Sequence, residues 1–294
     1  MIRARLRNMI LGGVVALIAP LIATAQDAPD VPPKRVVSIN LCTDQLAMML
    51  ADPGQLVSVS VLAREPESSA MVEEAQGFPI NYARAEEIFM LKPDLVVAGA
   101  FSSQATVQML RKLGLAVEVF EPALSLDDVS AAMTRMGAAL HQDARAAHQV
   151  AQFEARLAAL REQVTTRPRA AIYYANGYSV GDQSLSGQIL ATAGFDNIAR
   201  EAGIPMAGNI PLEVLALLDP DVVITGQRYP AASRSEEILD HPVVRQLQDA
   251  RLRGTIADRD WICGTPHVLR AVEGLIGLRH DYDALGPAAE GAGE

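Results

Sequence analysis

Apolar residues occur along the chain in two alternating kinds of segment. Short runs such as residues 35–39 and 56–60 are rich in Val and Ile and favour buried strands. Between such runs, apolar residues recur every three or four positions, as at Val129, Met133 and Met136, which favours amphipathic helices. Strands that alternate with helices in this way predict parallel sheets of the α/β class.

One strand-and-helix unit occurs twice. Residues 86–99 read EEIFMLKPDLVVAG and residues 213–226 read EVLALLDPDVVITG, and the two align without a gap at an offset of 127. Each copy predicts a short helix with a glutamate near its start, a Pro-Asp turn and a buried strand that ends at Gly. A repeat spaced by about a domain's length implies two similar lobes, and a cleft between two lobes is a common place for a ligand.

A helical region separates the two copies. Ser125 with Asp128 resembles a capping box, and a second helix is expected from Asp143 to Gln163, without Gly or Pro. We expect this helix to act as a rigid rod that permits only small motions of the lobes. The division expected is an N-terminal lobe at 34–141, a linker helix at 142–165 and a C-terminal lobe at 166–285.

The chain begins with the pattern of a secretory signal peptide. Three arginines precede an apolar stretch at residues 10–22 and a small-x-small site at 23–25, so we expect residues 1–25 to be removed. The apolar stretch is too short for a good membrane span, and no cysteine follows the cleavage site as a lipid anchor would require. Residues 26–33 read as a flexible lead and residues 286–294 as a disordered tail. The mature protein is expected to be soluble and periplasmic.

The net charge limits the possible binding partners, and the cysteine content raises the question of a disulfide. The formal net charge is −10, which argues against nucleic acid as a partner. The two cysteines, Cys42 and Cys263, leave three alternatives open in an exported protein: a disulfide, two unpaired thiols, or contact with a ligand or metal. We expect unpaired thiols, because a disulfide across the cleft would clamp the lobes of a protein that must release its cargo.

At this point the chain resembles the periplasmic binding proteins of ABC importers for vitamin B12, iron-siderophores and haem, over roughly residues 34 to 285. The carriers of the resemblance are RVVSINLCTDQLAMML, both copies of the repeat, the predicted rod helix and DWICGTPHVLRAVEGL. The resemblance implies two Rossmann-like lobes with parallel sheets joined by a single long α-helix, with the ligand between them. It also implies a monomer without a cofactor or enzymatic activity, which delivers a metal chelate to an ABC permease dimer in the inner membrane.

By motif position, the resemblance implies that Glu86 and Glu213 dock onto arginines of the permease. A negative charge in the first turn of a helix is also favoured by the helix dipole. Each glutamate is therefore open to the plainer interpretation of a helix-start residue, and Glu87 could take the place of Glu86.

Ligands of open parallel sheets lie beyond the carboxyl ends of the strands, which nominates the loops there. The candidate ligand-binding residues are Asn40, Leu41, Cys42, Thr43, Arg64 and Phe101 in the first lobe, and Tyr174, Tyr178, Arg228, Tyr229 and Trp261 in the second. The two arginines would suit an anionic ferric chelate, whereas a neutral corrinoid would need the aromatic walls and amides. Trp261 is expected at the ligand, with a core position as the alternative, and one of Tyr173 and Tyr174 is expected in the core.

Other chemistries remain as alternatives. Ser179 lies in GYSVG, the pattern of a hydrolase nucleophile elbow, with Asp221 and two histidines later in the chain. Haem would need one axial Tyr, for which Tyr174, Tyr178 and Tyr229 are candidates. The five histidines are too scattered to predict a bare metal site. A sensor or scaffold for another membrane complex is a third possibility. We expect an iron-siderophore or cobalamin-type chelate as the ligand.

Overall fold

The computed structural model describes residues 31–161, 167–227, 234–250 and 252–285. The predicted signal peptide, most of the flexible lead, the end of the predicted linker helix and the C-terminal tail lie outside the described residues. From Pro32 onward the described residues form one compact unit. No helix among them combines the length and the apolar character that a membrane crossing requires.

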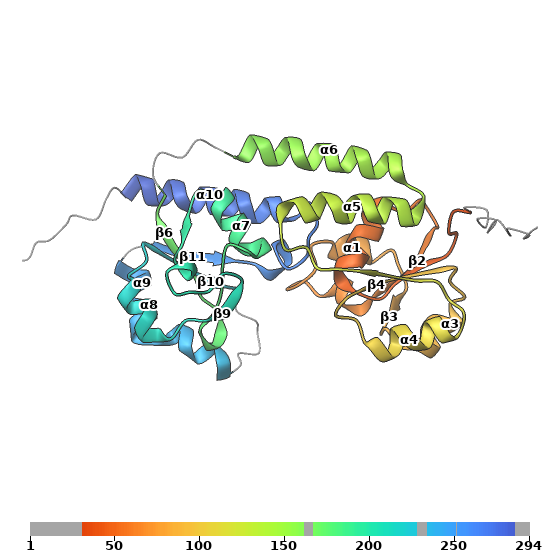
Figure 1. Cartoon of the computed structure of the whole chain (residues 1–294), viewed down its shortest axis with the longest axis horizontal. Coiled ribbons are helices and arrows are strands. Elements are labelled where there is room, and N and C mark those ends of the chain that lie inside the picture. Colours follow the sequence, from red (N-terminus) through yellow and green to blue (C-terminus); the bar gives the residue numbers. More distant parts are fainter. Residues whose placement is uncertain (1–30, 162–166, 228–233, 251, 286–294) are drawn as a thin grey trace, which may run out of the picture. The chain divides into compact units, whose positions relative to one another are not determined.

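The N-terminal lobe is built on a parallel five-stranded sheet with the strand order β3-β2-β1-β4-β5 (Figure 1). The strands are β1 (Val36–Ser38), β2 (Leu56–Ser60), β3 (Ile80–Asn81), β4 (Leu95–Gly99) and β5 (Val117–Phe120). The intervening helices are α1 (Leu41–Leu50), η1 (Val61–Arg64), α2 (Val72–Ala75), α3 (Ala85–Met90) and α4 (Gln104–Lys112). The strand order reverses between β1 and β4, and such a switch point opens a crevice at the carboxyl ends of the two strands.

The C-terminal lobe repeats this plan on a parallel four-stranded sheet with the order β11-β10-β6-β8. The strands are β6 (Arg169–Ile172), β8 (Asp196–Asn197), β10 (Val222–Gly226) and β11 (Leu252–Ile256), and β7 (Tyr178–Val180) and β9 (Ala207–Asn209) form a separate antiparallel pair. The helices are η2 (Ala175–Gly177), α7 (Leu185–Thr192), η3 (Ile198–Arg200), α8 (Leu212–Leu218), η4 (Arg234–Asp240), α9 (Pro242–Ala250), η5 (Asp258–Asp260) and α10 (Val268–Leu285). Here the switch point lies between β6 and β10. The predicted α/β class with two parallel-sheet lobes is confirmed.

Each sheet buries both of its faces, as parallel sheets require. In the N-terminal lobe Val36 and Val97 face a core shared with α1 and α5, whereas Val37 and Val96 face a second cluster with α3 and α4. The shared core continues into the C-terminal lobe through α7 and α10, and a third cluster lies between the second sheet and α8 and α9. The two sheets are therefore separate, but the hydrophobic core behind them is continuous.

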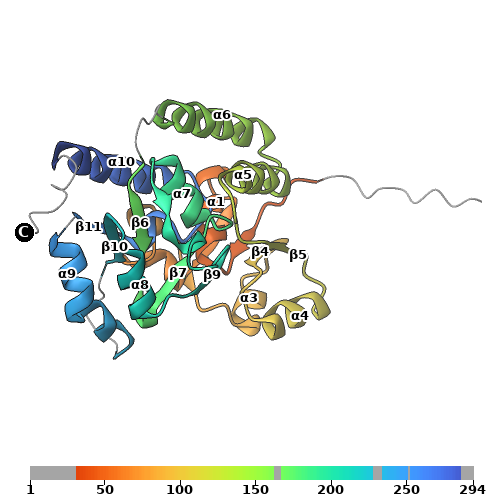
Figure 2. The ribbon, with the colours of Figure 1, turned by 60° about the vertical axis from the view of Figure 1, so that its left-hand side comes forward.

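Two helices connect the sheets. α5 (Leu126–Leu140) begins with the predicted capping box, in which the Ser125 hydroxyl accepts from the Asp128 backbone N–H and the Asp128 carboxylate accepts from that of Ser125. It ends at His141, whose φ of 56° is left-handed. α6 (Asp143–Leu160) follows and ends earlier than the predicted Gln163. Both views show α6 along α5 (Figures 1 and 2).

The repeated units share tertiary contacts that their sequence alignment does not show. Asp94 accepts hydrogen bonds from the backbone N–H groups of Lys34 and Arg35, and Asp221 accepts one from the N–H of Arg169. The Arg35 guanidinium donates to the carbonyl of Lys92, and that of Arg169 donates to the carbonyl of Asp219. These equivalent Asp–Arg clasps tie each helix–turn–strand unit to the start of the neighbouring strand.

Candidate functional site

The first candidate loop follows β1 at the switch point of the N-terminal lobe. Asn40 caps α1, because its side-chain oxygen accepts from the backbone N–H of Cys42 at 3.0 Å. Leu41 and Thr43 are buried, and the Thr43 hydroxyl contacts Ser38 Oγ at 2.8 Å. Asn40 and Cys42 are half-buried. Of the four predicted residues in this loop, these two are the more accessible.

The terminal glycine of each repeat makes room for the residue that follows the neighbouring strand. A Cβ atom on Gly99 would lie 2.7 Å from the Asn40 side chain, and one on Gly226 would lie 2.6 Å from the ring of Tyr174. Both distances are too short for a real contact, so only glycine allows the present packing. Asn40 and Tyr174 therefore occupy equivalent places at the two switch points, an amide in one lobe and an aromatic ring in the other.

Three aromatic residues of the C-terminal lobe form a row. The ring centroid of Tyr174 lies 5.6 Å from that of Trp261 and 6.4 Å from that of Tyr178, within the range of tilted aromatic pairs. Trp261 is only 3% exposed, so the structure places it in the core beneath Tyr174, whereas Tyr178 is 42% exposed. Phe101, after β4 in the other lobe, is 86% exposed.

Tyr173 is the core member of the two adjacent tyrosines, and Tyr174 is half-buried. Tyr173 is fully buried and donates its hydroxyl to the carbonyl of Ile210 at 3.2 Å. Burial, reinforced by the negative charge of Glu213, raises the pKa of Tyr173 and keeps its hydroxyl protonated as a donor. The expectation that one of the pair belongs to the core is confirmed.

A disulfide joins the two lobes, so the expectation of unpaired thiols is wrong. Cys42 at the start of α1 is bonded to Cys263 in the loop before α10, with a Cα–Cα distance of 5.1 Å. Next to it, the side chains of Gln45 and Thr265 meet at 3.3 Å, and both residues are fully buried. The bond lies within an interface that is already closed, rather than across an open mouth. It therefore need not oppose ligand release in the way that the sequence argument assumed.

A cavity of about 110 Å³ lies beside this disulfide. Four predicted ligand residues line it, together with neighbours from both lobes: Asn40, Cys42, Thr43, Phe101, Phe120, Glu121, Pro122, Ala123, Ile262 and Gly264 among others. The loop after β5, at residues 121–123, had not been predicted here. The rule that nominated the other loops would have found it, because this loop also follows the carboxyl end of a strand.

Only one member of the predicted cationic pair, Arg64, lies within the described residues. The Arg64 guanidinium donates to the carbonyls of Ala75 and Phe78, at 3.3 and 2.6 Å, and so holds its own lobe's loop in place. Arg228 and Tyr229 lie outside the described residues. In the part of the chain that the structure describes, no group of three or more His, Cys, Asp or Glu side chains could hold a metal ion.

Known proteins resemble this arrangement along most of the chain. A family model described as periplasmic binding protein matches residues 36–251. The chain belongs to the periplasmic binding protein family. A cobalamin-binding protein of Halobacterium salinarum is 30% identical over 202 residues, which cover 67% of this chain but only 55% of the relative. The chain thus spans about half the length of that relative.

Solved structures of the periplasmic binding protein family share the fold. The haem-binding protein RhuT of Roseiflexus sp. RS-1 has a TM-score of 0.67 at 24% identity, covering 85% of this chain and 98% of that one. The vitamin B12-binding protein BtuF of Vibrio cholerae has a TM-score of 0.65 at 18% identity, covering 86% and 98%. The family consists of binding proteins and not enzymes.

The position of Ser179 fits a binding protein and argues against the hydrolase alternative. Ser179 lies in β7, is fully buried and has no hydrogen-bond partner for its hydroxyl. Asp221, the predicted acid of a triad, instead accepts from the backbone N–H of Arg169. A nucleophile needs a base within hydrogen-bonding reach and access to substrate, and Ser179 has neither.

The acidic ends of the repeat are exposed, as a docking role requires. Glu86 and Glu213 lie in the first turns of α3 and α8, and both are exposed. Glu87 is half-buried, and its carboxylate accepts from the backbone N–H of Tyr82 at 2.8 Å. Glu87 therefore has a local structural role, and Glu86 is the glutamate of this turn that is left for a partner.

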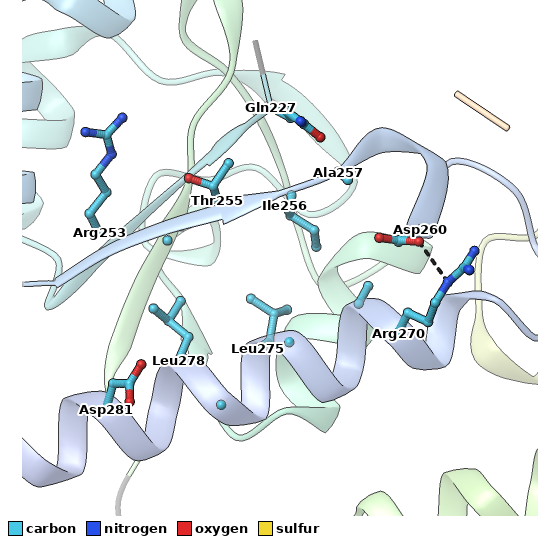
Figure 3. A pocket seen from close by; sticks show the side chains of 14 residues that line it. Gln227, Arg253, Thr255, Ile256, Ala257, Asp260, Arg270, Leu275, Leu278 and Asp281 are labelled. Carbon is cyan, nitrogen blue, oxygen red and sulfur yellow. Dashed lines mark ion pairs between the residues drawn. The ribbon is translucent and has the colours of Figure 1, made fainter. Parts of the chain in front are cut away.

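A second cavity, of about 480 Å³, lies between β11 and α10 (Figure 3). Arg253 and Thr255 line it from the strand, Asp281 and Leu278 line it from the helix, and an ion pair joins Asp260 to Arg270 at 2.9 Å at one end. All of its lining residues belong to the C-terminal lobe. It therefore does not match the expectation of a ligand held between the two lobes.

One buried carboxylate lies in α1, next in sequence to Thr43 of the candidate loop. Asp44 in α1 is fully buried and accepts hydrogen bonds from the backbone N–H and the hydroxyl of Ser60, at 3.0 and 2.5 Å. Burial raises the pKa of Asp44 to about 6, and these hydrogen bonds lower it only in part. The Asp44 carboxyl, which joins α1 to β2 through Ser60, therefore changes its charge at about pH 6.

Proposed function

We propose that the chain captures a metal chelate between its two lobes in the periplasm and delivers it to an ABC permease in the inner membrane. Among chelates of the siderophore and cobalamin types, a cobalamin-type ligand is favoured. The observation that carries this choice is the make-up of the two switch points. They present an amide at Asn40 and an aromatic row at Tyr174 and Tyr178.

Charge supports the same choice. An anionic ferric chelate is best held by arginines whose donors are available to it. Arg64, the candidate within the described residues, directs its guanidinium to carbonyls of its own lobe. A large neutral macrocycle that carries amide side chains gains more from aromatic surface and a few amide hydrogen bonds. The similarity to a cobalamin-binding protein agrees with this choice but does not carry it.

Spectroscopic titration tests the ligand. Purified protein is incubated separately with cyanocobalamin, ferric enterobactin and haemin, passed through a desalting column and examined by absorbance, because each class has its own chromophore. We expect cyanocobalamin to be retained at one equivalent, and Tyr178→Ala to weaken its retention. Retention of the ferric chelate alone would overturn the choice of cargo, and retention of none would overturn the binding function.

Haem is the second candidate, since the exposed Tyr178 is a possible axial ligand of iron. Tyr178→Phe distinguishes the two cargoes. It keeps the aromatic ring and removes the ligating oxygen, so it should leave cyanocobalamin binding intact and abolish the charge-transfer band of a tyrosinate-bound haem.

The permease contact is proposed at Glu86 and Glu213. Exposed carboxylates presented once per lobe suit two equivalent cationic sites on a two-fold partner. The variant Glu86→Ala with Glu213→Ala should keep its chelate affinity and lose uptake in a strain that lacks the native protein. Glu73→Ala, another exposed glutamate at a helix start, is the matched control. Uptake equal to wild type in the double variant would contradict the assignment.

A further inference from the structure

An exposed apolar side chain is duplicated along with each docking glutamate. Met90 and Leu217 occupy the same position of the repeat, four residues after Glu86 and Glu213. They are 74% and 84% exposed. Single exposed apolar residues are common on protein surfaces, but here the same position is apolar and exposed in both lobes. Residues four apart lie on one face of a helix, so each lobe presents a carboxylate beside an apolar side chain.

The backbone around this pair is held in the same way in both copies. After each helix, the chain passes through a left-handed residue, Lys92 with φ of 49° and Asp219 with φ of 40°, before the shared proline. Such a conformation is unfavourable for residues other than glycine, so the surrounding contacts impose it. The Asp–Arg clasps at Asp94 and Asp221 provide such contacts. Each pair is thereby fixed on its sheet.

The two helices that carry these pairs also share a side of the molecule. In both views α3 and α8 lie away from α6 and α10 (Figures 1 and 2). The charge of the pair selects the chemistry of a partner, because an exposed carboxylate is best matched by an arginine. The apolar neighbour requires an apolar recess next to that arginine. Presentation of the same element by two lobes requires the recess to occur twice.

We propose that each lobe docks through a two-residue element, a glutamate and the apolar residue one turn later, onto two equivalent sites of a two-fold symmetric membrane partner. This inference rests on the proposed transport function. An exposed ion pair alone contributes little in water, because solvent screens it. Met90 and Leu217 would exclude water from the ion pairs, as the near-neutral surroundings of an interface hot spot do. The apolar residues are thus expected to carry affinity that the glutamates alone do not supply.

Substitution of the apolar residues tests this inference. Met90→Ser with Leu217→Ser should leave the chelate affinity unchanged and reduce uptake of radiolabelled cyanocobalamin about ten-fold or more, since burial of each side chain stabilises an interface. Each single variant should show a smaller loss. Met109→Ser and Leu285→Ser are matched controls, because these residues are 47% and 68% exposed and lie outside the repeat. The controls should transport as the wild type does.

The outcomes separate this inference from the function on which it rests. A protein that retains none of the three chelates overturns both. A protein that binds its chelate, but whose uptake is unchanged in Met90→Ser with Leu217→Ser, overturns the apolar element alone. If transport follows a chelate other than cyanocobalamin, the same variants are compared with that chelate. Sedimentation of the free protein tests the alternative that the surface binds a second copy of the chain. Self-association that is lost in the double variant, with unchanged uptake, would assign the surface to that copy.

Discussion

Loss of the disulfide should destabilise the whole protein. Cys42 and Cys263 are separated by 221 residues, so the bond closes most of the folded chain into one loop. In the chain-entropy model a loop of this length stabilises the folded state by roughly 5 kcal/mol at 25 °C, and measured values are commonly about 2–4 kcal/mol. Because one hydrophobic core runs through both lobes, we expect this loss to appear in a single unfolding transition.

The perturbation is Cys42→Ser with Cys263→Ser. Unfolding in guanidinium chloride, followed by far-UV circular dichroism, should give a free energy of unfolding lower by about 2–5 kcal/mol than that of the oxidised wild type. At about 2–4 °C per kcal/mol for a protein of this size class, the midpoint of thermal unfolding should fall by roughly 4–20 °C. Wild-type protein kept in a strong thiol reductant is the control and should match the double variant.

Three results would refute this reasoning. Two reactive thiols in denatured, unreduced protein from an oxidising compartment would show that the bond does not form. Equal unfolding midpoints for the oxidised protein and the double variant would show that the bond forms without constraining the unfolded chain. A variant that unfolds in two separate steps would instead show that the shared core does not couple the lobes.

Two further predictions concern Asp44 and Gly226. Asp44→Asn should be more stable than the wild type at pH 7.5 by about 3 kcal/mol. The reason is that burial raises the Asp44 pKa from 3.8 to about 6, so the ionised carboxylate destabilises the folded state. Wild-type stability should fall as the pH rises from about 4 to 6, the variant should lack this component, and denaturant curves across that range would detect it. Gly226→Ala should displace the Tyr174 ring and weaken chelate binding in a titration, whereas Gly274→Ala, where a Cβ meets no atom within 4 Å, should not.

Local patterns of the sequence were sufficient for elements whose limits depend on neighbouring residues. β2 (Leu56–Ser60) has the bounds that were predicted, and the capping box at Ser125 begins α5 as expected. These features depend on neighbouring residues, which periodicity and capping rules describe. The short strands were missed for the opposite reason. Asn81 in β3 is a fully buried amide that donates to the carbonyls of Ser38 and Val59, so distant backbone groups and not an apolar run determine its place.

The candidate site was predictable in its loops but not in its side-chain roles. The carboxyl-end rule placed Asn40 and Phe101 at one cavity, because topology alone fixes where strands end. It gave no information on whether a side chain points outward. Arg64 turns toward carbonyls of its own loop, and Trp261 packs behind Tyr174. The disulfide could not be derived either, because its geometry depends on how two segments 221 residues apart approach each other.

The two ends of the repeated unit are under different constraints, and this difference bears on function. At the helix end, both copies keep an exposed glutamate and an exposed apolar residue. At the strand end, both copies keep a glycine, yet the side chain accommodated there is Asn40 in one lobe and Tyr174 in the other. Two equivalent pairs of surface residues suit a partner with two equal sites, whereas an amide in one lobe and an aromatic row in the other suit a cargo with two unlike faces. Under the proposed function, a change of cargo would then require substitutions at the residues opposite the glycines, and none at the proposed docking residues.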